Sequence, residues 1–208
     1  MENKYLIAID LDDTALDNIY ELNDLTVKVL KRLSKMGHKV MIATARPTSL
    51  TLPHYKRLEL DTLTALCNGA DLVADLAGAH QTLQRKYLSD SDLRKIFETI
   101  PLDDIDDLGI ERNDVLYMFG EMEGSSYFKE LIKQSNVEYF DISSIPFVDA
   151  GRIFMRLKDT PEAMESLNKL KSMESLSVYY KKMGWEREQI YVSVRSVFAD
   201  KWYSVKDA

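Results

Sequence analysis

The sequence has 208 residues, of which 45% are hydrophobic and 29% charged, a normal balance for a globular chain long enough to bury a core. Asp and Glu outnumber Lys and Arg by 34 to 27, which argues against a nucleic-acid-binding surface. No apolar run approaches the ~18–20 residues needed to cross a bilayer, so no membrane partner is expected. The single cysteine, Cys67, excludes an internal disulfide and favours the reducing cytoplasm.

The N-terminal third alternates apolar runs with one amphipathic segment. Asn23 is placed to cap a helix that continues to Met36, and Gly37 supplies the left-handed residue that ends such a helix. Three apolar runs are typical of strands buried on both faces of a parallel sheet: 5–9, 39–43 and 63–67. This order of elements predicts a right-handed α/β crossover sheet with helices on both faces, a three-layer Rossmann-like core.

The middle of the chain predicts a smaller α+β domain inserted into this core. Ser89 with Asp92 indicates a capped helix, and Thr160 followed by proline indicates a second. The acidic stretch 102–114 contains five aspartates and is expected to be a surface loop. Further strands are expected at 115–119, 137–140 and 152–157, and a helix at 126–134.

The C-terminal part is expected to return to the first sheet. A helix is predicted from Met173 to Met183, ended by Gly184, and the β-rich segment 189–194 follows it. The expected domains are therefore a core at 1–75, an α+β cap at 76–171, and a second core part at 172–208.

Two carboxylates follow the first predicted strand. A buried strand that ends in acids places them at the C-terminal edge of the sheet, where open α/β folds bind ligands. Asp10 and Asp12 lie two residues apart, so on an extended chain they point to the same side. Paired carboxylates repel unless a cation lies between them, and oxygen ligands at an open edge suit Mg²⁺. The alternative is that these acids cap the turn that follows.

A second polar segment follows the second predicted strand. Thr44 and its neighbouring backbone N–H groups are expected to face the same crevice as Asp10, where they would hold phosphate oxygens. Arg46 lies two residues further on and has two equal interpretations, as a phosphate ligand or as the partner of a surface acid.

Together these segments resemble the haloacid dehalogenase superfamily. Segment 10–14, Asp-Leu-Asp-Asp-Thr, is similar to its motif Asp-x-Asp-x-Thr, and segment 44–47, Thr-Ala-Arg-Pro, to the Thr-Gly-Arg-Pro of the Cof-type branch. The Asn-Gly-Ala at 68–70 is similar to the stretch before that branch's cap. The resemblance covers about the first 75 residues well.

This resemblance implies a Mg²⁺-dependent hydrolase of a small phosphorylated metabolite, and sugar phosphates are the first class of substrate to test. Asp10 would be the nucleophile that forms an aspartyl-phosphate, and Asp12 the general acid and base. Both would hold the metal. Thr44 and Arg46 would bind the phosphoryl group.

The late motifs of the family are not clearly present. Its charge-balancing lysine aligns with Ser172, next to Lys171, and its late acid aligns with Ser193 and Val194, so that Asp200 is the first later carboxylate. The expected role of Asp200 is a solvated acid near a frayed terminus, and a truncated C-terminal core is expected. A catalytically weak or silent binding protein and a phosphotransferase on the same scaffold are the alternatives, and the sequence leaves the oligomeric state open.

Overall fold

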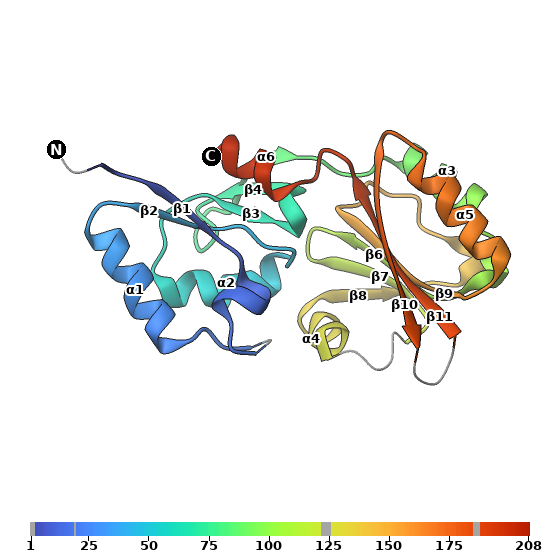
Figure 1. Cartoon of the computed structure of the whole chain (residues 1–208), viewed down its shortest axis with the longest axis horizontal. Coiled ribbons are helices and arrows are strands. Elements are labelled where there is room, and N and C mark those ends of the chain that lie inside the picture. Colours follow the sequence, from blue (N-terminus) through green and yellow to red (C-terminus); the bar gives the residue numbers. More distant parts are fainter. Residues whose placement is uncertain (1–2, 19, 122–125, 185–187) are drawn as a thin grey trace. The chain divides into compact units, whose positions relative to one another are not determined.

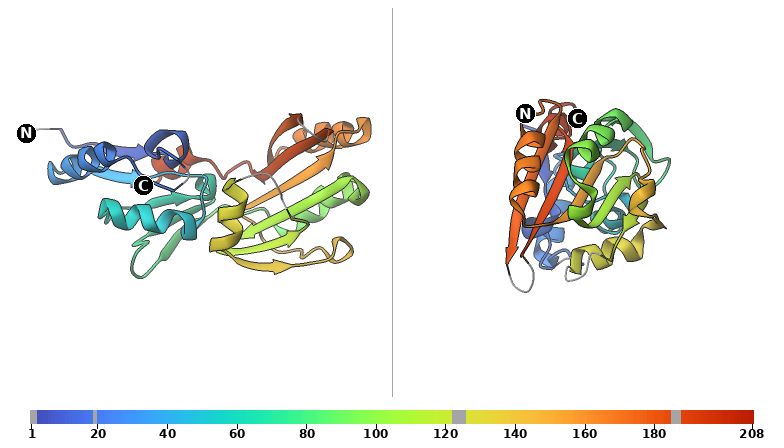
Figure 2. Two further views of the ribbon diagram at one scale, coloured as in Figure 1. Left: turned by 90° about the horizontal axis from the view of Figure 1, so that it is seen from below. Right: turned by 90° about the vertical axis from the view of Figure 1, so that its right-hand side faces the viewer.

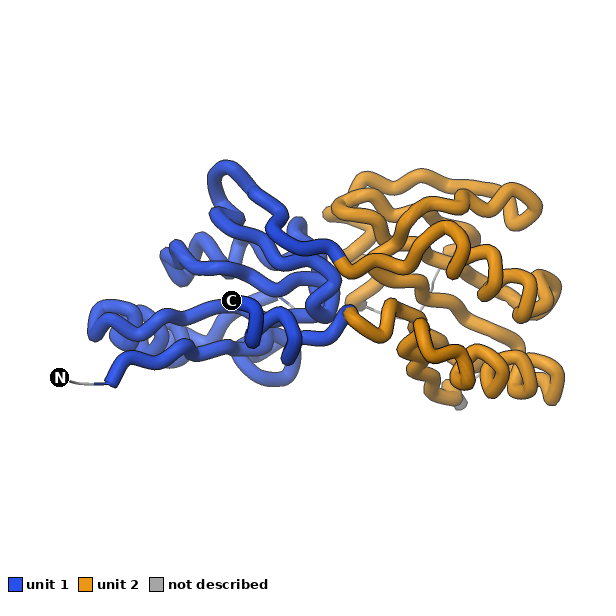
Figure 3. The backbone as a smooth tube through the Cα atoms, turned by 90° about the horizontal axis from the view of Figure 1, so that it is seen from above, with its two compact units in different colours: residues 1–85, 199–208 blue, residues 86–198 orange. Residues whose placement is uncertain are grey.

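The computed structural model describes residues 3–18, 20–121, 126–184 and 188–208. The chain forms two compact units (Figures 1 and 3): the first contains residues 1–85 and 199–208, and the second contains residues 86–198. These units divide the chain at different positions from the expected domains. Residues 76–85 stay with the first unit, and residues 172–198 belong to the second.

The first unit contains the expected parallel strands. β1 pairs with β2 in parallel, and a parallel bridge from Ala43 to Ala65 places β2 beside β3. Two further strands then continue from β3 in antiparallel order. The bounds are β1 (Leu6–Ile9), β2 (Lys39–Ile42), β3 (Thr64–Leu66), β4 (Asp71–Ala74) and β5 (Gln81–Arg85).

Helices lie on both sides of these strands, which gives the predicted three-layer α/β arrangement (Figure 1). α1 (Asp24–Lys35) and α2 (Thr48–Leu58) cover one side, and α6 (Lys201–Lys206) the other. The predicted cap of α1 is confirmed, because the Asn23 side chain accepts from the N–H groups at its first turn. On the opposite side, Met41 and Ala43 form a small core against which Val205 of α6 packs.

The second unit is an α+β domain built on a six-stranded sheet in the order β10-β11-β9-β6-β7-β8. Its neighbouring strands are antiparallel, except that β7 and β8 are parallel. The bounds are β6 (Ile105–Arg112), β7 (Val115–Phe119), β8 (Asn136–Tyr139), β9 (Arg152–Lys158), β10 (Leu176–Gly184) and β11 (Glu188–Ser196).

Two helices cover one face of this sheet (Figures 1 and 2). α3 (Asp90–Thr99) and α5 (Pro161–Lys171) bury their leucines and isoleucines against the inward residues of β6, β9 and β11. α4 (Ser126–Gln134) contributes Phe128, whose ring packs against Phe154 and Tyr191. The predicted capping box of Ser89 and Asp92 at the start of α3 is confirmed.

Two sequence expectations for this region are wrong. The segment from Met173 to Met183 is not a helix: most of it forms β10, whose Leu176, Val178 and Tyr180 alternate onto the core. The segment 189–194 lies in β11, which pairs with β10 and β9 of the second unit and does not return to the first sheet. Pairing between strands and the β preference of Val and Tyr outweigh the local helical pattern here.

The acidic stretch 102–114 is also not a surface loop, because most of it forms the central strand β6. Its hydrophobic residues alternate into the core, and its acids are paired across the sheet. Buried Asp107 accepts from Arg156 at 2.5 Å, and buried Glu111 accepts from Arg152 at 2.7 and 2.8 Å. Opposite charges on the neighbouring strand therefore allow acids in a buried strand.

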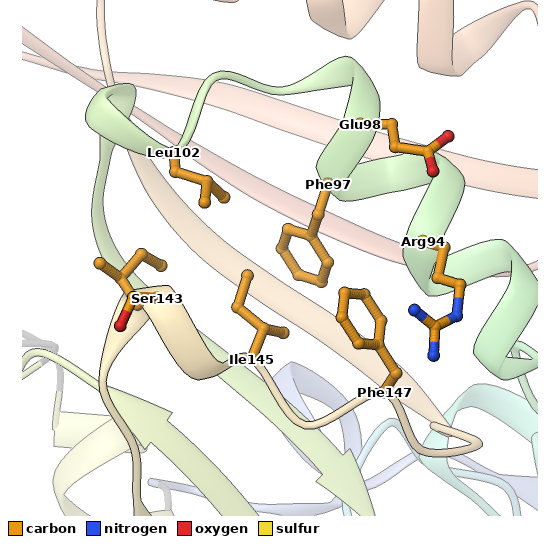
Figure 4. Close-up of a pocket in the computed structure, with 8 residues that line it drawn as sticks. Arg94, Phe97, Glu98, Leu102, Ser143, Ile145 and Phe147 are labelled. Atoms are coloured by element: carbon orange, nitrogen blue, oxygen red, sulfur yellow. The ribbon is translucent and has the colours of Figure 1, made fainter.

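The second unit also contains a small cavity of about 190 Å³ between α3 and the segment 142–147 (Figure 4). The rings of Phe97 and Phe147 line it, and the Arg94 guanidinium lies 4.2 Å from the centre of the Phe147 ring. None of the predicted site residues lines this cavity. Across the described parts of the chain, no helix is long and apolar enough to cross a membrane.

Candidate active site

Asp10 follows β1 directly, as the sequence predicts. Its backbone is extended, with φ −80° and ψ 159°, and its Oδ1 accepts from the N–H of Leu11 at 2.8 Å. Its other oxygen, Oδ2, accepts from the ammonium group of Lys201. The turn of residues Leu11–Ala15 follows and contains Asp13 in the left-handed region, at φ 54°. Asp tolerates this conformation better than most residues, so the local sequence suits the turn.

Asp12 lies in the same turn and is bonded to Arg46. Nε of Arg46 donates to the two carboxylate oxygens at 3.0 and 3.1 Å, and Nη2 donates to Oδ1 at 2.6 Å. The Arg46 side chain is 3% exposed, whereas that of Asp12 is 35% exposed. In this structure Arg46 is therefore the partner of an acid, Asp12, which is one of the two interpretations that the sequence leaves open.

Thr44 is fully buried between the ends of β2 and β3. Its Oγ1 accepts from the N–H of Arg46 at 3.1 Å, and its own N–H donates to the carbonyl of Ala65 at 2.9 Å. The N–H of Asn68 donates to the Thr44 carbonyl at 2.9 Å. The N–H groups of Thr44 and Arg46 are thus bonded within the fold.

Lys201 is a site residue that sequence reasoning missed. It is the first residue of α6, and α6 is held by Ser204, whose Oγ donates to the carbonyl of Gly69 at 3.0 Å. Gly69 has φ +84°, and a Cβ there would lie 2.4 Å from the Asp200 carbonyl oxygen. This close approach, which glycine permits, brings Lys201 to Asp10 across 191 residues of chain.

The late residues named from the sequence have other roles. Lys171, the proposed substitute for the charge-balancing lysine, lies in the second unit with its Nζ 4.4 Å from the centre of the Tyr180 ring. Asp200 is not at a frayed end, because its side chain caps α6 by accepting from the N–H of Trp202 at 2.8 Å. This cap marks where α6 begins, but it does not by itself indicate that Lys201 contacts Asp10.

A buried histidine adds to the electrostatics of the Asp12–Arg46 pair. His54 lies on α2 and is 5% exposed. Burial lowers its pKa to about 4, the positive charge of Arg46 acts in the same direction, and the charge of Asp12 opposes them. His54 is therefore neutral at pH 7, so the ion pair beside it receives no second positive charge from this side chain.

The sequence profile of the haloacid dehalogenase-like hydrolases matches residues 7–207. The chain belongs to this family. A 5-amino-6-(5-phospho-D-ribitylamino)uracil phosphatase of Bacillus subtilis, YitU, is 41% identical over 71 residues, which are 34% of this chain and 26% of that protein. A protein of Metamycoplasma hominis that is named a putative phosphatase is 36% identical over 73 residues. The matches to these curated relatives thus span about a quarter of their length.

Solved structures of the family share the fold of nearly the whole chain. A haloacid dehalogenase-like hydrolase from Bacteroides thetaiotaomicron superimposes with a TM-score of 0.73 at 13% identity, covering 99% of this chain and 76% of that one. A sugar phosphatase of subclass IIB gives a TM-score of 0.71 at 13% identity, covering 99% and 74%. These likenesses establish the fold.

The family resemblance implies Mg²⁺, and the donors of the first unit fit a sparse magnesium site. Mg²⁺ in phosphoryl-transfer sites is commonly held by one or two carboxylates, waters and the substrate phosphate. Asp10 provides one carboxylate of this kind, and the backbone carbonyl of Asp12 is the second oxygen donor that we expect. Within the described ranges, no three or more His, Cys, Asp or Glu side chains gather as a metal site. A metal held in this way would share the Asp10 carboxylate with Lys201.

Proposed function

We propose that this chain hydrolyses small phosphomonoesters through an aspartyl-phosphate on Asp10. The observation that carries the proposal is the arrangement within the first unit, where Lys201 bonds Asp10 and Arg46 bonds Asp12. Membership of a hydrolase family supports it. Sugar phosphates are the first substrate class to test, because one structural neighbour is a sugar phosphatase and YitU acts on a phosphorylated ribityl compound.

In the first step, a carboxylate oxygen of Asp10 attacks phosphorus and the bond from phosphorus to the leaving oxygen breaks. Asp12, which Arg46 bonds as a carboxylate, must first take up a proton; it then transfers that proton to the leaving oxygen, which departs as an alcohol. The ammonium group of Lys201, bonded to Asp10, offsets the repulsion between two anions as they meet. Bound Mg²⁺, held by Asp10 and Asp12, would supply further neutralisation of phosphate charge.

In the second step, water attacks the phosphorus of the acyl phosphate and gives its proton to the Asp12 carboxylate. The bond from phosphorus to Asp10 breaks, and inorganic phosphate leaves. Thr44 is proposed to hold a phosphoryl oxygen, since a hydroxyl that accepts from the Arg46 N–H still has its own proton to donate. Arg46 is the second phosphate ligand expected from the sequence, although its guanidinium is engaged with Asp12.

The test is phosphate release from 4-nitrophenyl phosphate by the purified chain, with and without Mg²⁺. Asp10→Asn should reduce release to background, because an amide cannot act as the nucleophile. Asp13→Asn makes the same chemical change in the same turn at an exposed residue, and it should leave release unchanged. Acid-quenched protein should carry a hydroxylamine-sensitive phosphoryl group that Asp10→Asn lacks. Undiminished release by Asp10→Asn would remove Asp10 from the mechanism.

A second candidate is a silent binding or regulatory protein with the same fold. It is favoured by the fact that both carboxylates are already paired with cations of the chain. It predicts binding of inorganic phosphate without turnover over a broad substrate panel. A phosphotransferase would instead be recognised by a phosphorylated sugar product. The single cysteine supports a cytoplasmic protein, and the proposed reaction makes a small phosphorylated metabolite its partner.

A further inference from the structure

We propose that Arg46 is a positioning residue, which fixes the orientation of the Asp12 carboxylate and does not bind the substrate phosphate. The inference rests on the proposed hydrolysis, in which Asp12 must present its carboxyl group to the leaving oxygen. It differs from the role that the family resemblance implies, in which Arg46 binds the phosphoryl group.

The contact between the two side chains constrains the carboxylate in two directions. Nε and Nη2 lie on one edge of the planar guanidinium, and together they reach both oxygens of Asp12, at 2.6 to 3.1 Å. Such a fork fixes the plane of a carboxylate as well as its position. Within the part of the chain that the structure describes, Arg46 is the side chain whose hydrogen bonds hold Asp12.

Arg46 is itself held firmly, which a positioning residue requires. Its N–H donates to Thr44 Oγ1 at 3.1 Å, and its carbonyl accepts from the N–H of Cys67 at 3.0 Å. The residue is therefore tied to the loops after both β2 and β3. Its side chain is 3% exposed, so the buried arginine forms the fixed half of the pair.

Asp12 has the opposite character. It lies in a turn, its own backbone is extended at φ −66° and ψ 134°, and the next residue is left-handed. Its side chain is 35% exposed, which leaves it accessible to a substrate. Without Arg46 the carboxylate would rotate among several rotamers, and a displacement of ~1 Å in a reacting group costs about 10²-fold in rate.

The same geometry argues against phosphate as the partner of this guanidinium edge. The Nε–Nη2 edge already holds Asp12, and with only 3% of its side chain exposed Arg46 presents little surface to a substrate. Moving this edge to the substrate would leave Asp12 without its fork in the step that needs Asp12 placed.

The experiment compares two substrates that differ in their need for a general acid. An alkyl phosphate such as 2-glycerol phosphate needs its leaving oxygen protonated, whereas 4-nitrophenyl phosphate has a good leaving group and needs this less. Arg46→Lys keeps the positive charge but loses the fork. The Arg46→Lys variant should have a kcat/KM for the alkyl phosphate that is lower by about 10²-fold. Its kcat/KM for the aryl phosphate should stay within about 3-fold of the parent value. Competitive inhibition by inorganic phosphate should be unchanged. Arg46→Gln, which retains a neutral donor, provides the same comparison if the lysine variant unfolds.

Two further variants complete the design. Asp12→Asn should show the same dependence on the leaving group, and adding Arg46→Lys to it should cause no further loss, because both changes act through one carboxyl group. Arg57→Lys is the matched control, since Arg57 lies on the adjacent helix α2 and pairs with Asp24 at 2.6 Å on the surface. It should change neither substrate's kinetics.

A uniform loss on both substrates, with weaker inhibition by inorganic phosphate, would overturn the inference and return Arg46 to phosphate binding. Additive losses in the double variant would also overturn it. Either result would leave hydrolysis intact as long as Asp10→Asn remained inactive. Failure of the proposed function would instead appear as activity retained in Asp10→Asn, so the two failures are distinguishable.

Discussion

Gly69 is a position at which the C-terminal helix α6 packs closely on the rest of the first unit. Gly69→Ala would place a Cβ 2.4 Å from the carbonyl oxygen of Asp200 and 2.8 Å from Ser204 Oγ, in a residue at φ +84°. The left-handed backbone costs about 1–2 kcal/mol for alanine. Overpacking against the backbone of α6 adds about 1–3 kcal/mol. The expected loss is therefore about 2–5 kcal/mol in the free energy of unfolding.

The control is Gly37→Ala, which separates the two contributions. Gly37 has φ +86°, but its added Cβ would meet the flexible end of Lys4, which can move aside. It should lose only the backbone part, about 1–2 kcal/mol. Urea unfolding followed by circular dichroism measures both changes. Gly69→Ala should also lower phosphatase turnover, because a shifted α6 withdraws Lys201 from Asp10, whereas Gly37→Ala should not. Equal destabilisation with unchanged turnover in the two variants would refute this reasoning.

Two further predictions concern buried charges. Arg152→Met would leave Glu111 buried without its bidentate partner, so the free energy of unfolding measured by urea titration should fall by about 3–5 kcal/mol. The control, Arg57→Met at the surface, should lose less than about 1 kcal/mol. Similar losses in the two variants would contradict the argument from burial of the pair. His54 has a folded-state pKa of about 4 against an ordinary value of 6.5, so the unfolded chain binds the extra proton between these values. The free energy of unfolding should therefore fall as pH drops from 6.5 to 4, by at most about 1.4 kcal/mol per pH unit for this group. His54→Gln should reduce this dependence on pH. An unchanged dependence in the variant would show that other groups cause it.

The parts of the fold that could be predicted from the sequence are those set by local chemistry. The caps at Asn23 and Ser89 depend on side chains within three residues of the helix start, and the structure has both. The proximity of Asp12 to the segment after β2 also follows locally, because parallel neighbouring strands end at the same edge.

The errors arose where distant residues decide the structure. The segment of β10 has helical spacing, yet it pairs along its length with β11. The acids of β6 are tolerated only because arginines of β9 lie opposite them. The position of Lys201 depends on how α6 docks on Gly69, and no periodicity near residue 201 records that contact.

The discontinuity of the first unit has a consequence for how the protein is made. The second unit, residues 86–198, is one uninterrupted stretch, whereas the first needs residues 199–208 to finish it. At ~5–20 residues per second, the ribosome adds Lys201 about 10–40 s after Asp10, given the 191 residues between them. During that interval the nascent chain holds Asp10 without its ammonium partner. Proteolysis that removes only α6 would return a finished molecule to the same state.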